Sequence, residues 1–216
     1  MRTSKQIKIF DLLRLQMVED QIRRRGISDK RVLDAMTTVP RHLFVEIYQQ
    51  QLSYIDGPLP IGHGQTISQP YIVAFMTEEL QILTHHTVLE IGTGCGYQSA
   101  VLSMLAKEVI SLEYVVKLAK TARKRLSKLG YDNIKVYNAN GMNGWEENAP
   151  YDRIIGTAAP TSMPDKLIEQ LAPLGRMIIP VGGSIFDQSL FIITKNKKGA
   201  VKIKRSLSVR FVPMVG

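Results

Sequence analysis

The stretch Val88-Leu89-Glu90-Ile91-Gly92-Thr93-Gly94-Cys95-Gly96-Tyr97 carries the clearest structural pattern in this chain. Its first four residues form a short, mostly apolar run of the kind that becomes a buried strand, and glycine then occupies every second position. Glycines directly after a strand let the backbone turn sharply and approach a ligand, with the N–H groups of a following helix pointing toward it. The stretch therefore predicts a strand, a turn and a helix. The turn is a candidate ligand site, although the same glycines could form a tight turn that binds nothing.

The pattern of short strands and helices continues from this stretch toward the C-terminus. Strands are expected at Val88–Ile91, Val109–Leu112, Ile134–Tyr137, Arg153–Gly156 and Met177–Val181. Helices are expected between them at 97–106, 115–129 and 163–172. This alternation predicts an α/β fold with a doubly wound, mostly parallel sheet. Residues 190–194 and 201–212 flank the turn residues 196–199, which predicts a C-terminal antiparallel hairpin.

Residues 1–83 differ from this alternating core and are expected to form an N-terminal cap of helices and loops. A helix is predicted over 5–25, closed by Gly26, with these apolar residues facing inward: Ile9, Leu12, Leu13, Leu15, Val18 and Ile22. Ser28 is expected to cap a second helix that buries Val32, Leu33 and Met36 and stops before Pro40.

Residues 49–70 are rich in glycine and proline, which predicts an ordered loop. Pro70 is expected to begin a helix that carries Ile72, Val73, Phe75, Met76, Leu80 and Leu83. The expected division is therefore 1–83 for the helices and this loop, and 84–216 for the α/β core with its hairpin.

The charge of the chain is unevenly distributed. The 216 residues carry a net charge of +9, but residues 1–31 carry +5, residues 116–130 carry +6 and residues 195–216 carry +7, which leaves −9 for the remainder. A uniformly basic protein is thereby excluded. The single cysteine excludes a disulfide framework, and the four histidines show no metal-ligand spacing, so no metal is expected. No apolar run approaches the length of a membrane span or a signal peptide, which predicts a cytoplasmic protein without membrane attachment.

The glycine turn distinguishes between two classes of cofactor. A dinucleotide fingerprint needs a glycine three residues after Gly94, where this chain has Tyr97. Glycine at alternate positions, with Glu90 two residues before them, is similar instead to class I S-adenosylmethionine methyltransferases, whose fold is Rossmann-like. Glu113 lies 17 residues beyond Gly96, at the end of the second expected strand. A carboxylate at this position could accept hydrogen bonds from the ribose hydroxyls of the cofactor, although it could also be a solvated acid.

Asn140 and Gly141 follow the third expected strand and would lie near the adenine ring. Asn140 could accept a hydrogen bond from the adenine amino group, and Gly141 would leave room for the ring, although Asn-Gly alone is often only a turn.

Two kinds of nucleic-acid methylation are excluded by residues that the chain lacks. Enzymes that methylate amino groups of bases carry Asn/Asp-Pro-Pro-aromatic after the fourth strand, whereas residues 156–160 read Gly-Thr-Ala-Ala-Pro. Methylation at cytosine C5 needs a nucleophilic cysteine, and Cys95 lies inside the glycine turn.

The loop Asp56-Gly57-Pro58-Leu59-Pro60-Ile61-Gly62-His63-Gly64-Gln65-Thr66-Ile67-Ser68-Gln69-Pro70-Tyr71 is the most specific motif in the chain. Together with residues 88–97, 149–155, 179–182 and 209–213, it closely resembles the bacterial type of the protein-L-isoaspartate O-methyltransferase family. The resemblance implies methyl transfer from S-adenosyl-L-methionine to the α-carboxylate of L-isoaspartyl residues, with S-adenosyl-L-homocysteine as product. It also implies isoaspartyl-containing proteins and peptides as partners, and we expect a monomer.

The resemblance assigns roles to individual positions. Ser68 matches the active-site serine of the family, and Gln65, Thr66, Ile67 and Ser68 match its loop over cofactor and substrate. The positions that match cofactor contacts are Glu90, Gly92, Gly94, Cys95, Gly96, Glu113, Tyr114, Asn140 and Gly141. Asn140 stands where the family usually has Asp.

The chemistry implied needs no general base, because a carboxylate with a pKa near ~4 is already ionised at pH 7. Catalysis would then rest on aligning the carboxylate oxygen with the methyl group and sulfur and on excluding water. Ser68 could hold the acceptor carboxylate in line, or it could cap the helix that begins at Pro70.

Two alternatives remain open at this stage. One is a class I methyltransferase with another acceptor, and the other is a nucleic-acid-binding protein that uses its basic termini and keeps a vestigial site. The six charges of residues 116–130 would lie opposite an apolar helix face, as on an ordinary solvated helix, without interleaved aromatic residues for stacking. Nucleic acid is therefore the less favoured partner.

Overall fold

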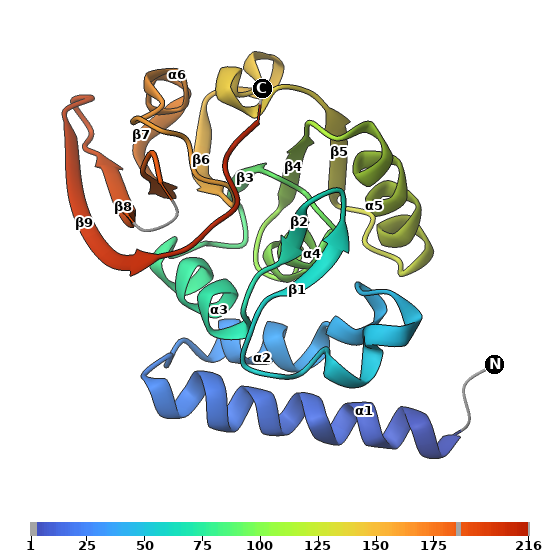
Figure 1. Ribbon diagram of the computed structural model, residues 1–216. Helices are drawn as coiled ribbons and strands as arrows, with labels where there is room; N and C mark the ends of the chain where they lie inside the picture. Colours follow the sequence, from blue (N-terminus) through green and yellow to red (C-terminus); the bar gives the residue numbers. More distant parts are fainter. Residues whose placement is uncertain (1–3, 185–186, 216) are drawn as a thin grey trace.

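A seven-stranded sheet with helices on both faces forms the centre of the computed structural model, which describes residues 4–184 and 187–215 (Figure 1). The strand order is β5-β4-β3-β6-β7-β8-β9. The strands are β3 (Thr87–Ile91), β4 (Glu108–Glu113), β5 (Ile134–Asn138), β6 (Tyr151–Gly156), β7 (Leu171–Val181), β8 (Gln188–Lys195) and β9 (Val201–Val209). Strands β3 to β7 pair in parallel, whereas β8 and β9 pair antiparallel. The predicted α/β class, the parallel core and the C-terminal hairpin are all confirmed.

The strand order reverses direction at β3, and this reversal positions the site. From β3 the chain continues to β4 and β5 on one side of the sheet, and it then returns to β6 and β7 on the other side. In open α/β sheets, ligands bind in the crevice beyond the carboxyl ends of the strands at such a reversal. The ends of β3, β4 and β6 therefore define where to look.

Helices cover the two faces of the sheet unequally. Residues of α4 (Tyr97–Ser103) and α5 (Val116–Lys128) share one buried cluster with the N-terminal helices, while α6 (Asp165–Glu169) packs on the opposite face. The expected helix over 163–172 is thus shorter, because Pro164 precedes its first turn and Leu171 already belongs to β7.

The N-terminal helical segment departs from the predicted amphipathic helix. It consists of α1 (Ser4–Gln16), a π-helical turn η1 (Met17–Ile22) and a 3₁₀ turn η2 (Arg23–Arg25), and it ends at Gly26 in the left-handed region. The prediction that Ile9, Leu12 and Leu15 face inward is wrong, since their exposed fractions are 48%, 57% and 52%. Val18 and Ile22 are buried as predicted, and Phe10 and Met17, which were not predicted to face inward, are buried as well. The wider π turn changes the rotation per residue, so a face extrapolated at helical spacing does not match the face that contacts the core.

The cap of the second helix, α2 (Lys30–Thr38), is Asp29 and not Ser28 as predicted. The Asp29 carboxylate accepts a hydrogen bond from the Arg31 N–H at 2.9 Å. The Ser28 backbone N–H instead donates to Glu78 Oε1 at 2.7 Å. The buried face of α2, which includes Val32, Leu33 and Met36, is confirmed.

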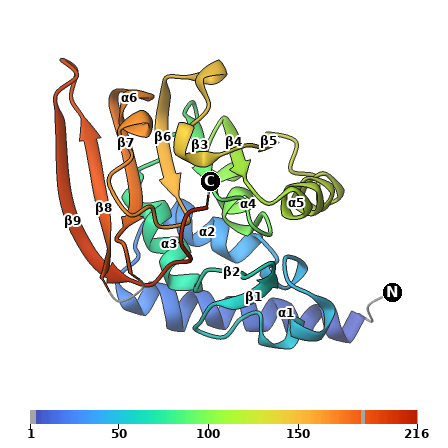
Figure 2. The same ribbon diagram turned by 45° about the horizontal axis from the view of Figure 1, so that its top comes forward.

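The loop over 49–70 contains more regular structure than predicted. After the 3₁₀ turns η3 (Arg41–Leu43) and η4 (Ile47–Leu52), strands β1 (Leu59–Gly62) and β2 (Gln65–Ile67) form an antiparallel hairpin. Helix α3 (Pro70–Glu79) begins at Pro70 as predicted, but Leu83 lies beyond it and is exposed. Figure 2 shows the hairpin close to the N-terminal helical segment.

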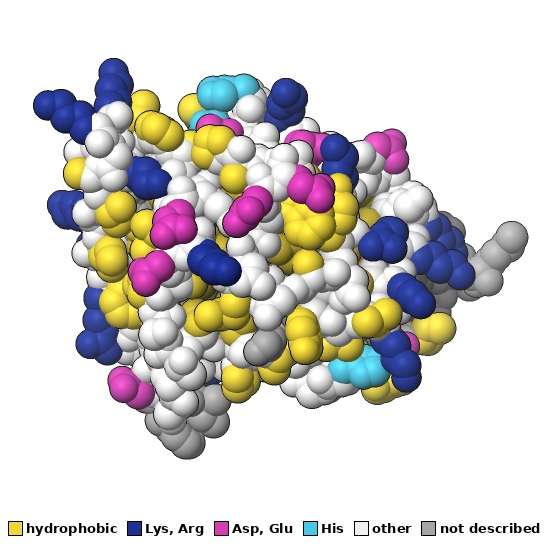
Figure 3. Space-filling view, turned by 90° about the horizontal axis from the view of Figure 1, so that it is seen from above, with side chains coloured by type: hydrophobic (Ala, Val, Ile, Leu, Met, Phe, Trp, Pro, Cys, Tyr) yellow, Lys and Arg dark blue, Asp and Glu magenta, His cyan; other side chains and the backbone are white. Residues whose placement is uncertain are grey.

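Basic side chains lie at two separate places on the surface. In Figure 3, Lys and Arg side chains gather over the β8–β9 hairpin on one side and over α5 on the other, with acidic side chains between them. Leu118, Ala119, Ala122 and Leu126 of α5 are buried, so its charges lie on a solvated face as predicted. Within residues 4–184 and 187–215, no helix has the length and apolar character that a membrane span requires.

Candidate active site

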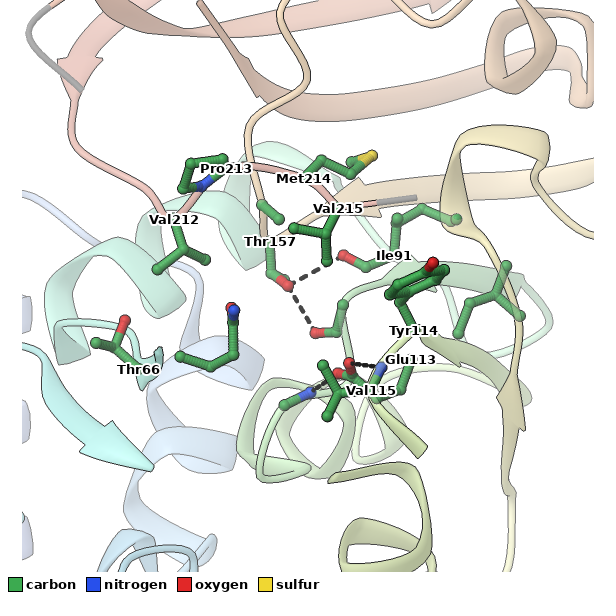
Figure 4. A pocket seen from close by; sticks show the side chains of 16 residues that line it. Thr66, Ile91, Glu113, Tyr114, Val115, Thr157, Val212, Pro213, Met214 and Val215 are labelled. Carbon is green, nitrogen blue, oxygen red and sulfur yellow. Dashed lines mark hydrogen bonds between the residues drawn. The ribbon is translucent and has the colours of Figure 1, made fainter. Parts of the chain in front are cut away.

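A cavity lies at the carboxyl ends of β3, β4 and β6, where the strand order reverses (Figure 4). Gly92 and Gly94 contribute the glycine turn after β3, and Glu113 and Tyr114 come from the end of β4. The other lining residues are Gln65, Thr66, Ile91, Leu112, Val115, Gly141, Thr157, Ala158, Val212, Pro213, Met214 and Val215. The site thus brings together the hairpin, three strand ends and the C-terminal segment.

The Glu113 carboxylate is the most strongly fixed polar group in this cavity. Its Oε2 atom accepts a hydrogen bond from the Gly94 N–H at 2.7 Å, and its Oε1 atom accepts one from the Val115 N–H at 2.8 Å. The side chain is only 6% exposed. Each carboxylate oxygen has a second acceptor position, so Glu113 can also bind two hydroxyl donors such as those of a ribose.

Thr157 holds the glycine turn from the neighbouring strand. Its hydroxyl lies 3.0 Å from the Ile91 carbonyl oxygen and 2.6 Å from that of Gly92 (Figure 4). A Cβ atom on Gly92 would lie 2.3 Å from this hydroxyl oxygen, and Gly92 also has a φ of +99°. The position therefore accepts only glycine. Thr157 directly follows the predicted strand Arg153–Gly156, but nothing in the sequence pattern marks it as a functional residue.

Glu90 lies beneath the turn and is not among the residues that line the cavity, so its predicted cofactor contact stays a prediction. It is fully buried, and its Oε2 atom accepts hydrogen bonds from the hydroxyls of Ser99 and Ser111. The Ser111 hydroxyl in turn lies 2.6 Å from that of Thr93 in the turn. Burial raises the pKa of Glu90 to about 7.

Two other expected cofactor residues, Asn140 and Gly96, also lie outside the cavity wall. The Asn140 side chain caps the 3₁₀ turn η5 (Gly141–Asn143), because its Oδ1 atom accepts from the Met142 N–H at 2.9 Å. Gly96 is the N-cap of α4, in the left-handed region with a φ of +91°. Of the two residues predicted to lie near the adenine ring, Asn140 and Gly141, only Gly141 lines the cavity.

A second cavity of about 500 Å³ adjoins the first. It contains Ser68, and it shares Thr66, Thr157 and Val212 with the first cavity. A smaller cavity lined by residues that include Ile67, Ser68 and Cys95 shares Thr66 and Thr157 with both. Two ligands bound in the first and second cavities would therefore meet at a common wall.

The alternative prediction, that Ser68 caps helix α3, is wrong. The N-cap of α3 is Gln69, and no side chain caps this end of the helix. Ser68 instead lines the second cavity at its boundary with the first.

The C-terminal segment forms one wall of the first cavity, a position that the sequence pattern does not predict. Residues 212–215 cross from the end of β9 to the end of β6 (Figures 1 and 2). Ala159 holds them in place, since its N–H donates to the Val212 carbonyl at 2.9 Å and its carbonyl accepts from the Met214 N–H at 2.8 Å. Residues 209–213 resemble a family motif, but only the sheet topology brings them to this cavity.

Comparison with known proteins agrees with this geometry. Residues 14–216 match the family described as protein-L-isoaspartate(D-aspartate) O-methyltransferase. The chain is 52% identical over 212 residues to the protein-L-isoaspartate O-methyltransferase of Synechococcus sp., covering 95% of this chain and 86% of that one. It is 50% identical over 207 residues to that of Geobacter metallireducens, covering 96% and 95%.

Among solved structures, this chain is similar to a Plasmodium falciparum protein described as a protein-L-isoaspartate O-methyltransferase, in complex with S-adenosyl-L-homocysteine. The TM-score is 0.79 at 27% sequence identity, and the alignment covers 94% of this chain and 98% of that one.

Proposed function

The chain belongs to the protein-L-isoaspartate O-methyltransferase family, and we propose that it methylates the α-carboxylate of L-isoaspartyl residues in damaged proteins and peptides. S-Adenosyl-L-methionine is the methyl donor in this proposal, and S-adenosyl-L-homocysteine is the product. The methyl ester would then cyclise to a succinimide that can reopen to normal aspartate.

The observation that carries the proposal is the wall shared by the two cavities. Donor and acceptor must approach one another for direct transfer, and Thr66, Thr157 and Val212 line both cavities. We assign the donor to the first cavity, because Glu113 offers free acceptor positions for ribose hydroxyls there. We assign the acceptor to the second, because its volume of about 500 Å³ suits a peptide side chain and its backbone.

The mechanism follows from these positions. When bound, the cofactor supplies an electrophilic methyl group on a sulfonium sulfur. The acceptor carboxylate is already ionised at neutral pH, so no protein group has to remove a proton. In this proposal Ser68 donates its hydroxyl proton to one carboxylate oxygen, which holds the other oxygen in line with the methyl group. Thr66 of the hairpin and Val212 of the C-terminal segment limit the access of water.

The proposal also assigns residues to the cofactor and a role to each part of the chain. The residues assigned to the cofactor are Gln65, Thr66, Gly92, Gly94, Glu113, Tyr114 and Gly141, all of which line the first cavity. Ile67 and Cys95 line the smaller cavity that shares Thr66 and Thr157 with the other two. Residues 1–83 supply the active-site loop and 84–216 the cofactor core, although one buried cluster joins the two parts. We further propose a monomer that acts in the cytoplasm.

A labelled transfer assay tests the function. The protein is incubated with methyl-radiolabelled cofactor and either an isoaspartyl peptide or its normal aspartyl twin. We expect base-labile label only in the isoaspartyl peptide. Labelling of neither peptide by a protein that binds S-adenosyl-L-homocysteine would indicate another methyl acceptor.

A further inference from the structure

The active-site loop between Asp56 and Gln69 is closed by its own end residues. The Gln69 side-chain Nε2 donates to Asp56 Oδ1 at 2.8 Å, across a sequence separation of 13 residues. The chain between them contains the β1–β2 hairpin and Ser68. The position of the loop therefore depends on side chains at its base as well as on the hairpin.

Arg25 contacts the first residue of this loop and the helix that follows it. Its NH1 atom donates to Asp56 Oδ2 at 3.1 Å and to Oδ1 at 3.3 Å. The guanidinium carbon also lies 3.7 Å from the centre of the Tyr71 ring, in the first turn of α3. One cation thus connects the beginning of the loop to the helix that follows it.

The segment that carries Arg25 is anchored in the core. Met17, Val18 and Ile22 of the π turn are buried, and Gly26 ends the segment directly after Arg25. Gln21 adds a second link to the root of the loop, since its Nε2 atom donates to the Tyr54 carbonyl at 2.8 Å. Arg25 is therefore held at a defined place relative to the loop.

We propose that Arg25, Asp56, Gln69 and Tyr71 form a positioning cluster that sets the location of Ser68 between the two cavities. This inference rests on the proposed function. Arg25 and Asp56 line neither cavity, so they act through the loop and not on the substrate. Gln69 transmits the effect, because it is the direct neighbour of Ser68 and lines the acceptor cavity with it.

The cluster is expected to affect the loop more than the stability of the fold. The side chains of Arg25 and Asp56 are 40% and 44% exposed, and ion pairs at that exposure contribute little to the free energy of unfolding. A displacement of a catalytic group by about 1 Å, in contrast, can lower a rate by as much as ~100-fold.

The test compares Arg25→Met, Asp56→Asn and the double variant with the control Arg24→Met. Arg24 lies in the same 3₁₀ turn, but its guanidinium pairs with Asp20 and Glu19 of its own segment. We expect each single variant to lower kcat for the isoaspartyl peptide by roughly tenfold. The double variant should be no worse than either single one, because each single variant already removes the ion pair between Arg25 and Asp56. Arg25→Lys, which keeps the charge, should recover part of the activity.

Two further measurements separate positioning from other roles. The Kd for S-adenosyl-L-homocysteine should stay within about twofold of wild type, because the contacts of Glu113 are untouched. Hydrogen exchange of the amides between 57 and 68 should be faster in Arg25→Met than in Arg24→Met, whether or not the protein methylates the peptide. Equal exchange in the two variants, or wild-type kcat in Arg25→Met, would overturn the positioning cluster. An inactive wild-type protein with the expected exchange difference would overturn only the proposed function.

Discussion

The Gly94 N–H donates to Oε2 of Glu113 at 2.7 Å, and this bond joins the glycine turn after β3 to the end of β4. The other carboxylate oxygen accepts from the Val115 N–H at 2.8 Å, so one side chain fixes the backbone on both sides of the candidate ribose site. The Gly94 N–H needs an acceptor in this position. The carboxylate therefore serves the fold of the turn and the binding of the cofactor together.

Replacing Glu113 with Gln should weaken cofactor binding. An amide has one acceptor oxygen where the carboxylate has two, so one of the two backbone N–H bonds and part of the ribose contact are lost. Hydrogen bonds to charged groups contribute about 1.5–3 kcal/mol each, which corresponds to a Kd for S-adenosyl-L-homocysteine that is roughly 10- to 100-fold higher. Titration calorimetry measures this change.

Glu108→Gln is the matched control for that variant. Glu108 begins the same strand, but it forms a surface ion pair with Lys135 at 2.6 Å and lies far from the strand end that binds the cofactor. Its Kd should equal that of wild type. A Glu113→Gln protein with wild-type affinity would contradict the ribose assignment.

Ser68→Ala should lower activity without lowering stability. Since Gln69 is the N-cap of α3, removing the Ser68 hydroxyl removes no helix cap. We expect kcat to fall by roughly 10- to 100-fold, the loss of one hydrogen bond to a charged group, while Tm changes by less than about 2 °C. Ser127→Ala, on the exposed surface of α5, should change neither quantity. A Ser68→Ala variant as active as wild type would exclude the role of this hydroxyl.

The corrected helix cap leads to a stability prediction. Asp29→Ala should lower the free energy of unfolding by about 1 kcal/mol, because it leaves the Arg31 N–H without its acceptor. Ser28→Ala should have almost no effect, since the Ser28 backbone N–H keeps its bond to Glu78. Urea unfolding of both variants measures the difference, and a larger loss for Ser28→Ala would restore the original assignment of the cap.

Glu90 should make the protein less stable as the pH rises from about 4.5 to 7. Burial raises the pKa of Glu90 from 4.5 to about 7, so between these values the folded protein holds a proton that the unfolded chain has released. Stability falls with pH wherever the folded state binds more protons. At pH 8 the accumulated cost of ionising Glu90 is on the order of 3 kcal/mol.

Glu90→Gln removes this titration while keeping the size of the side chain. The difference in the free energy of unfolding between Glu90→Gln and wild type should therefore increase in favour of the variant as the pH rises from 5 to 8. Urea unfolding at several pH values measures it. A difference that does not depend on pH would show that Glu90 stays ionised in the folded protein.

The features that could be predicted from the sequence depend on neighbouring residues. Each core strand is a short apolar run, and the turn at Gly92 and Gly94 is set by local backbone geometry, so both were found correctly. Pro70 likewise marks the start of α3 whatever surrounds it.

The features that could not be predicted depend on distant contacts. Asp29, and not Ser28, caps α2. The backbone N–H groups of both residues donate to Glu78, which lies 49 residues beyond Asp29 in the sequence. Leu12 is exposed because a π turn changes the rotation between α1 and the buried residues that follow. Glu90 matched a cofactor position in the sequence, but its hydrogen bonds to Ser99 and Ser111 hold it below the turn.

The C-terminal segment should control how long the cofactor stays bound. Met214 and Val215 line the first cavity, and the space left beneath them is about 60 Å³, far below the roughly 300–1,000 Å³ of ordinary small-molecule sites. We therefore expect the segment to move outward when a nucleoside enters and its apolar side chains to cover the bound ligand. Replacing both residues with Ala keeps the backbone bond from the Met214 N–H to Ala159 but removes most of that cover. Each buried methylene contributes about 0.8 kcal/mol, so partial loss should raise the dissociation rate of S-adenosyl-L-homocysteine roughly three- to tenfold.

Stopped-flow displacement measures this dissociation rate. Ile203, on β9, is exposed to about the same extent as Val215 and does not line the cavity, so Ile203→Ala should leave the rate unchanged. An unchanged rate in the double variant would show that the segment does not cover the ligand.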